Sequence, residues 1–370
     1  MSTITPLKMP KWGLSMQEGI VQDWHIREGD RIVEGQEIVD VETSKITNVF
    51  EAPYAGRVAR IVARSGETIP VGALLAVIAE EAVSASDIEA FILAFQDSFT
   101  PELEQDAGGP MEQRIEIGDG RVLRASLMGE GAGDAVVFVH GFGGNLDDWA
   151  AVQPAIAARA RTVALDLPGH GGSTKMVGAG DIASLSEAIS AALKQIGVGR
   201  AHLVGHSLGA TVVLAFALAN PERVASVTLL CPAEAPGGTL NQDYLRAFLN
   251  ATRGRDLAKA LELLFADPSM ATRDLAEQIL RTKRLDGVEA ALSAIHAAMS
   301  APSFADLGLR MAEVAAPLTI LASKEDQIVG RLDEAALPSS VRLVWIDGVG
   351  HMPHVEKPSA VIAEIAAQLR

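Results

Sequence analysis

Hydrophobic and polar positions follow two different rhythms, and the change between them lies near residue 112. Over residues 1–80, short alternating apolar and polar runs are separated by glycines without a helical period, which predicts an all-β domain. After residue 112, apolar runs of strand length alternate with segments of helical length. This alternation predicts a largely parallel sheet covered by helices. We therefore expect two domains, as the length of 370 residues also favours.

The β-rich segment contains an internal repeat. Three glycines recur 37 positions later, and apolar residues such as Val21 and Val58, or Ile38 and Leu75, recur in the same frame. The glycine pairs are Gly19 with Gly56, Gly29 with Gly66 and Gly35 with Gly72. Glycines suit turns with positive φ, and the apolar partners would face one interior. Two similar strand sets predict a flattened barrel with quasi-two-fold symmetry.

Between the two halves, residues 40–48 must turn from one half into the other, which predicts an exposed hairpin with Lys45 at its centre. An exposed lysine usually serves solubility alone. A lysine at the most protruding point of a symmetric scaffold is also where a post-translational arm would be attached.

Residues 1–80 resemble the lipoyl domains of 2-oxo-acid dehydrogenase complexes. The matching motifs are Met9-Pro10, residues 13–19, Gly29-Asp30, residues 42–45 and residues 52–56. The resemblance implies that Lys45 carries covalent lipoate. Biotinyl carriers share the fold but usually place Met on both sides of the lysine. Here the neighbours are Ser44 and Ile46, so lipoate is preferred.

Residues 81–112 form an acidic linker without Lys or Arg. Within it, apolar residues at helical spacing predict an amphipathic helix with Ser86 or Asp87 as its N-cap: Ile88, Phe91, Ile92, Phe95 and Phe99. We expect this helix to dock on the following domain, with a partner-docking helix as the alternative. The segment does not resemble the basic subunit-binding module of the familiar complexes, so the way in which partners attach stays open.

The segment Gly205-His-Ser207-Leu-Gly209 directly follows an apolar run and opens an apolar helix. In a strand–turn–helix context, a G-x-S-x-G motif predicts a nucleophile elbow that presents the hydroxyl of Ser207. A serine needs a base that an acid orients. With a motif of this kind, the three residues follow along the chain in the order serine, acid, histidine. His351 is therefore the expected base and Asp326 the expected acid.

Competing candidates surround both positions. Glu325 and Asp347 compete with Asp326, and His354 competes with His351. We interpret His354, His202 and His206 as structural hydrogen-bonding residues.

Two backbone amides are expected to hold the oxyanion: Leu208, after the nucleophile, and Phe142, in the loop His140–Gly144. The loop Asp166–Ser173 is interpreted as packing behind the site. These motifs make residues 113–370 resemble the α/β-hydrolase superfamily. Residues of about 235–305 interrupt the strand alternation and are expected to form a helical cap.

Composition and charge exclude some classes of binding partner and location. The net charge of −16 argues against binding of nucleic acid, whose phosphates require clustered Lys and Arg. The N-terminus has no secretory pattern and no apolar run is long enough to span a bilayer, so we expect a cytoplasmic protein without a membrane segment. The single cysteine, Cys231, is expected to be a buried hydrophobe at a strand end. No metal site is predicted.

The combination of domains resembles the dihydrolipoyl acetyltransferase (E2) component of acetoin-cleaving dehydrogenase systems. The resemblance implies transfer of an acetyl group from S-acetyl-dihydrolipoyl-lysine to the cosubstrate CoA, in acetoin catabolism. It also implies a thiamine-diphosphate-dependent E1 and a dihydrolipoyl dehydrogenase (E3) as partners, while the oligomeric state stays open. Two alternatives remain: a lipoyl-bearing serine hydrolase or thioesterase, and a lipoyl carrier or scaffold whose hydrolase domain is idle.

Overall fold

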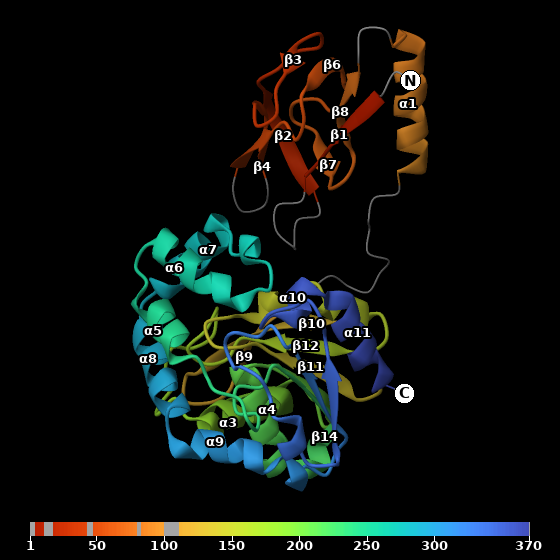
Figure 1. Ribbon diagram of the computed structural model, residues 1–370. Coiled ribbons are helices and arrows are strands. Elements are labelled where there is room, and N and C mark those ends of the chain that lie inside the picture. Colours follow the sequence, from red (N-terminus) through yellow and green to blue (C-terminus); the bar gives the residue numbers. More distant parts are fainter. Residues whose placement is uncertain (1–3, 11–17, 43–46, 80–82, 100–110, 370) are drawn as a thin grey trace. The chain divides into compact units, whose positions relative to one another are not determined.

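A computed structural model describes the chain except for residues 1–3, 11–17, 43–46, 80–82, 100–110 and 370 (Figure 1). The chain divides into two compact units, Met1–Asp106 and Ala107–Arg370. Among the described residues, no helix combines the length and the apolar character needed to cross a membrane.

In the described residues, the first unit is a flattened barrel of two four-stranded sheets, ordered β1-β8-β6-β3 and β5-β4-β2-β7. The strands are β1 (Ile4–Lys8), β2 (Glu18–Trp24), β3 (Arg31–Ile32), β4 (Glu37–Glu42), β5 (Thr47–Glu51), β6 (Gly56–Ile61), β7 (Thr68–Pro70) and β8 (Leu74–Ala79). Apolar residues from both halves, Val21, Val58, Ile38 and Leu75 among them, fill one core.

The repeat seen in the sequence is present in the sheets. Strands β2, β3 and β4 correspond to β6, β7 and β8, so the two sheets match strand by strand. The positive φ expected of the glycines holds for the second and third pairs, with 95° at Gly29 and 87° at Gly66. Gly56 serves a different purpose, because a Cβ there would lie 2.2 Å from Cγ2 of Ile78.

The linker contains the expected helix, α1 (Ala85–Ser98), but the helix begins two or three residues earlier than predicted. Its N-cap is Ser84, whose side chain accepts a hydrogen bond from the amide of Asp87. The expectation that α1 docks on the following domain is wrong. Its apolar face packs against β8 of the barrel, and Ile88 joins Leu74 and Val77 in one buried cluster. The helix therefore extends the first unit.

The second unit is built on an eight-stranded sheet of order β16-β15-β14-β13-β11-β12-β10-β9. Its strands are β9 (Met111–Glu116), β10 (Val122–Met128), β11 (Ala135–Val139), β12 (Thr162–Leu165), β13 (Ala201–His206), β14 (Val224–Leu230), β15 (Leu318–Ala322) and β16 (Val341–Trp345). The strands from β11 to β16 are parallel to one another, whereas β10 is antiparallel to both β12 and β9 at the edge of the sheet.

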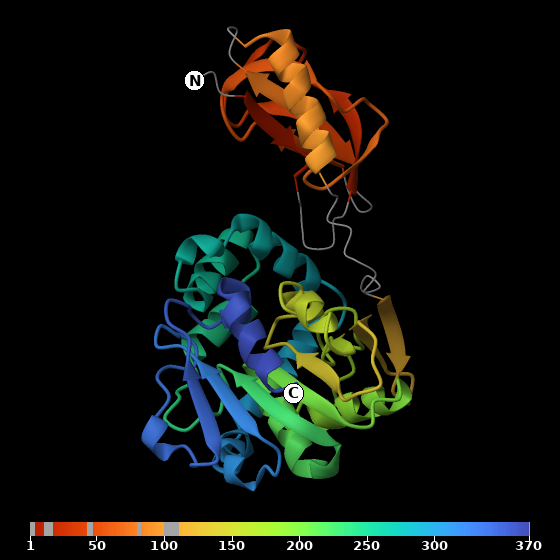
Figure 2. The same ribbon diagram turned by 90° about the vertical axis from the view of Figure 1, so that its right-hand side faces the viewer.

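Helices cover both faces of this sheet because the side chains of each strand alternate between them. In β11, Val137 and Val139 join the cluster that contains α3 and α4, whereas Val136 and Phe138 join the cluster that contains α11. Figure 2 shows α11 lying across one face. The covering helices are η1 (Leu146–Trp149), α2 (Gln153–Ala157), α3 (Ile182–Gln195), α4 (Leu208–Ala219), η2 (Pro221–Arg223), η6 (Glu334–Ala336), α10 (Pro353–Glu356) and α11 (Pro358–Ala367).

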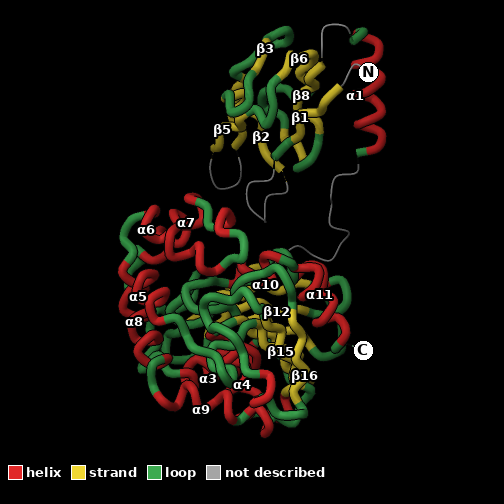
Figure 3. The backbone as a smooth tube through the Cα atoms, in the orientation of Figure 1, coloured by secondary structure: helices red, strands yellow, loops and turns green. Residues whose placement is uncertain are grey.

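A run of helices without strands separates β14 from β15 and forms the cap (Figure 3). Its elements are α5 (Gln242–Asn250), α6 (Gly254–Leu261), η3 (Glu262–Leu264), η4 (Pro268–Met270), α7 (Arg273–Lys283), α8 (Val288–Met299), α9 (Pro302–Leu309) and η5 (Met311–Glu313). Helix α9 returns to the main body and contacts α4.

Candidate active site

Ser207 stands in the sharp turn between β13 and α4. Its φ of 52° and ψ of −117° lie in a region that residues other than glycine rarely adopt. The turn closes because the flanking positions are glycines. A Cβ at Gly205 would lie 2.4 Å from the oxygen of Gly209, and one at Gly209 would lie 2.3 Å from the oxygen of Val139. This is the geometry of a nucleophile elbow.

His351 and Asp326 form a buried pair. Nδ1 of His351 lies 2.8 Å from Oδ2 of Asp326. The other oxygen, Oδ1, accepts hydrogen bonds from the amides of Ile328 at 2.8 Å and Val329 at 3.1 Å. Burial opposes the ionised form of Asp326, but His351 and the two amides outweigh it and keep the pKa of this carboxyl below its ordinary value.

The competing acids lie elsewhere. Glu325 is exposed and accepts a hydrogen bond from the hydroxyl of Ser323. The Asp347 side chain is 79% exposed and faces Lys324. His354 is fully buried, and among the described residues its ring nitrogens have no hydrogen-bond partner.

His206 joins the elbow to the loop of His351. Its Nε2–H donates to the backbone oxygen of His351 at 2.8 Å, and the two rings lie 4.8 Å apart. Since His206 directly precedes Ser207, this bond brings the nucleophile turn and the base loop together. His206 therefore has the structural hydrogen-bonding role expected of it, and its partner is the backbone of the loop that carries His351.

The loop His140–Gly144 lies against the elbow, because a Cβ at Gly141 would come within 3.2 Å of Cβ of Ser207. The amide of Gly143 donates to Nε2 of His170 at 3.1 Å, and that of Gly144 donates to the oxygen of Gly141 at 3.2 Å. Within the described part of the chain, the amide of Phe142 has no such acceptor.

Leu208 is the first residue of α4, where an amide has no partner inside the helix. Together with Phe142, it can therefore offer an N–H group to a ligand at the elbow.

Two neutral histidines support this loop. The amide of Leu167 donates to Nε2 of His140 at 3.0 Å, so Nδ1–H of His140 donates to the oxygen of Gly141 at 2.7 Å. His170 donates from Nδ1 to the oxygen of Pro168 at 3.1 Å. Burial lowers the pKa of His140 to about 4 and that of His170 to about 3. Both rings stay uncharged near neutral pH.

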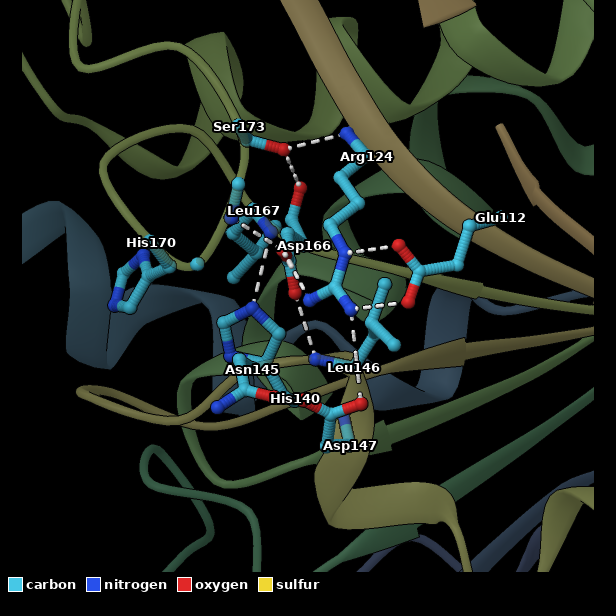
Figure 4. Close-up of polar contacts among 12 residues, drawn as sticks. Glu112, Arg124, His140, Asn145, Leu146, Asp147, Asp166, Leu167, His170 and Ser173 are labelled. Carbon is cyan, nitrogen blue, oxygen red and sulfur yellow. Dashed lines mark hydrogen bonds and ion pairs between the residues drawn. The ribbon is translucent and has the colours of Figure 1, made fainter. Parts of the chain in front are cut away.

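Asp166 anchors the loop behind the site (Figure 4). Its carboxylate accepts hydrogen bonds from the amides of Leu146 and Gly172, each at 2.7 Å, and lies 3.5 Å from the guanidinium of Arg124. Gly171 has a φ of 44°, and a Cβ there would lie 2.0 Å from the carboxylate. The motif Asp166–Ser173 thus serves as packing, as expected.

Cys231 follows β14 and is buried, as expected, but its φ of 43° was not foreseen. Burial, with the charge of Asp326 in second place, raises the pKa of the thiol well above its ordinary value, so it stays neutral. Among the described residues, Cys231, Asp326 and His351 place potential metal-ligand atoms within 4.8 Å of one another. His351 and Asp326 already bond to each other, so Cys231 lies beside an existing hydrogen-bonded pair.

Lys45 lies outside the described residues. Strands β4 and β5 pair up to Glu42 and Thr47, so the segment that contains Lys45 joins the ends of these two strands. Sequence reasoning also missed Glu356, whose carboxylate accepts from the backbone amide beside His351. Glu356 lies five residues after His351 and belongs to no recognised motif, so only its hydrogen bond to the base loop reveals its place in the site.

Two family models match the chain: the biotin-requiring enzyme (biotin/lipoyl) family over residues 5–78, and the alpha/beta hydrolase fold family over residues 134–358. Among solved structures, a 2-hydroxy-6-oxo-6-phenylhexa-2,4-dienoate hydrolase from Rhodococcus is 22% identical, with a TM-score of 0.63, covering 70% of this chain and 99% of that one. This likeness concerns the fold alone.

Two curated relatives match nearly the whole length. The dihydrolipoyllysine-residue acetyltransferase component of an acetoin cleaving system from Pseudomonas putida is 42% identical, covering 100% of both chains. The same component from Cupriavidus necator is 38% identical, covering 96% of this chain and 94% of the relative. The chain therefore belongs to the family of dihydrolipoyllysine-residue acetyltransferase components of acetoin cleaving systems.

Proposed function

We propose that this enzyme transfers an acetyl group from its own lipoyl arm to CoA, with Ser207 as nucleophile, His351 as base and Asp326 as the acid that orients it. The buried 2.8 Å contact between His351 and Asp326 carries the proposal, together with the hydrogen bond that joins His206, the residue before Ser207, to the backbone of His351. Full-length similarity to acetyltransferase components supports the choice of transfer over other hydrolase chemistry.

We further propose that lipoate is attached to Lys45. The residues of the described hairpin fit this group, because Glu42 and Thr47 close the strand pairing and leave the lysine on the connection between them. Lipoate on this lysine would present the acetyl group as a thioester. In this proposal, residues 1–80 carry the cargo, α1 within residues 81–112 extends their barrel while the rest of that segment links the domains, and residues 113–370 perform the chemistry under the cap.

In the first half of the reaction, His351 takes the proton of Ser207 as the serine oxygen attacks the thioester carbonyl. Asp326 holds the imidazole by its Nδ1–H and stabilises the imidazolium. The amides of Phe142 and Leu208 hold the oxyanion. His351 then gives its proton to the departing thiol, and the acetyl group stays on Ser207.

In the second half, His351 takes the proton of the CoA thiol, whose sulfur attacks the acetyl group. Ser207 recovers its proton as acetyl-CoA forms. Water competes at this step, so transfer requires a closed site. The burial of the reacting groups favours such a site, since Ser207 is 5% exposed and His351 is 2% exposed.

Membership in a family of E2 components supports the expectation that the protein works with two partner enzymes. In our proposal, a thiamine-diphosphate-dependent E1 loads the arm, and a dihydrolipoyl dehydrogenase, E3, reoxidises it.

The test supplies S-acetyl-dihydrolipoamide and CoA to the purified full chain and measures acetyl-CoA against free acetate. We expect acetyl-CoA to dominate and Ser207→Ala to abolish its formation. Free acetate as the main product would replace the proposal with a thioesterase. No acetyl-CoA above the uncatalysed rate, in wild type and in Ser207→Ala alike, would leave the chain as a carrier. Intact mass of the native protein and of Lys45→Arg tests the lipoate, which should be lost in the variant.

A further inference from the structure

The loop that carries His351 is attached directly to the cap. The amide of His351 donates to the backbone oxygen of Leu264, at the end of η3, at 2.7 Å. The preceding residue must be a glycine, because a Cβ at Gly350 would lie 2.7 Å from the nitrogen of Ala266 and 2.7 Å from the oxygen of Leu264. Cap and base loop therefore meet backbone to backbone.

One carboxylate bridges these two segments. Oε1 of Glu356 accepts a hydrogen bond from the amide of Ala266 in the cap at 2.7 Å, and Oε2 accepts one from the amide of Gly350 at 2.7 Å. An ionised carboxylate offers two acceptors, and its hydrogen bonds are stronger than those between neutral groups. In the described part of the chain, no Lys or Arg pairs with Glu356, so these amides are its main partners.

On its other side, the base loop is held by the elbow, because His206 donates to the oxygen of His351. The backbone of His351 is thus fixed by the cap through its nitrogen and by the elbow through its oxygen. Any movement of the cap segment 264–266 would pull on the residue whose imidazole must stay aligned with Ser207.

We propose that Glu356 is a positioning residue that clamps the cap onto the base loop, so that exclusion of water and alignment of His351 depend on one carboxylate. This inference rests on the proposed function, in which the acetyl group must reach CoA and not water. Without the clamp, the cap opens more often and more of the acetyl group is lost as acetate.

The test compares Glu356→Gln with wild type. Glutamine has the same shape but keeps a single acceptor, and its NH₂ group faces one of the two amides. We expect the ratio of acetate to acetyl-CoA, with S-acetyl-dihydrolipoamide and CoA as substrates, to rise about tenfold, the size expected for one charge-assisted hydrogen bond. Amide hydrogen exchange in residues 264–266 and 350–351 should accelerate by a similar factor.

The matched control is Glu364→Gln on α11, which removes a surface ion pair with Arg342 of β16 and should leave both readouts unchanged. A second variant, Gly350→Ala, keeps the carboxylate but adds a Cβ that would push the base loop away from cap residues 264–266. It should raise the ratio of acetate to acetyl-CoA and the rate of amide exchange as Glu356→Gln does, and it serves as the test if Glu356→Gln fails to fold.

Equal product ratios and equal exchange in wild type, Glu356→Gln and Gly350→Ala would overturn the clamp. If the wild type made no acetyl-CoA, the proposed function would fail, while the exchange measurement would still decide whether Glu356 holds the cap.

Discussion

Asp326 and His351 are 25 positions apart and lie in loops after two neighbouring strands, yet Oδ2 of one is 2.8 Å from Nδ1 of the other. The two amides on Oδ1 leave the carboxylate in a single orientation. This arrangement lets Asp326 fix the tautomer of the imidazole and stabilise its protonated form.

Replacing Asp326 by Asn should lower the rate of acetyl-CoA formation on the order of 10³- to 10⁴-fold, because the amide favours the wrong tautomer of His351. Circular dichroism should show an unchanged fold. Glu325→Gln and Asp347→Asn are the controls, since both side chains are exposed, and each should retain at least about half of the rate. A large loss in either control would move the acid to another position.

The elbow depends on the absence of a side chain at Gly205. Gly205→Ala should lower the free energy of unfolding by about 2–3 kcal/mol, because the added Cβ would lie 2.4 Å from a backbone oxygen. The control is Gly199→Ala, where the added Cβ meets nothing within 4 Å. Urea unfolding followed by tryptophan fluorescence measures the difference. Equal stability of the two variants would argue against the tight strand–helix contact.

The buried histidines predict a loss of stability in mild acid. In the folded protein, the pKa is about 4 for His140 and about 3 for His170, below the ordinary value of 6.5. At these two positions, from pH 6.5 down to about 4, the unfolded chain therefore binds more protons than the folded one, so both rings lower stability as the pH falls.

Where its ring is protonated in the unfolded chain but not in the folded one, each histidine should change the free energy of unfolding by about 1.4 kcal/mol per pH unit. Urea unfolding at several pH values measures it. His170→Gln, which keeps an acceptor for the amide of Gly143, should reduce the slope by about one proton. A slope independent of His170 would mean that this ring is charged in the folded state.

Helix α1 should stabilise the barrel. Phe95→Ala removes a ring that packs with Phe91, Phe99 and β8, and it should cost about 1–2 kcal/mol of local stability. Leu93→Ala, on the same helix but 66% exposed, should have little effect. Hydrogen exchange of the β8 amides in the full chain measures both. Identical protection in the two variants would contradict the packing of α1 on the barrel.

The sequence alone was sufficient for features that depend on local chemistry. The 37-residue repeat predicted matched strand sets, and the sheets contain them. Strand–turn–helix context around Ser207 predicted a sharp elbow, because the small residues that such a turn requires are its sequence neighbours. The alternation of apolar runs with helical segments likewise predicted a largely parallel sheet covered by helices, and β11 to β16 form its parallel part.

Only the tertiary structure decided which distant groups meet. The apolar face of α1 was visible in the sequence, but a periodic pattern does not say which surface will cover it, and the barrel did. Asp326 was separated from Glu325 by its burial and its contact with His351, and Glu356 became visible through its contact with an amide 90 positions earlier in the chain. Periodicity and turn chemistry act over a few residues, whereas these choices arise from long-range packing that brings loops of the folded chain together.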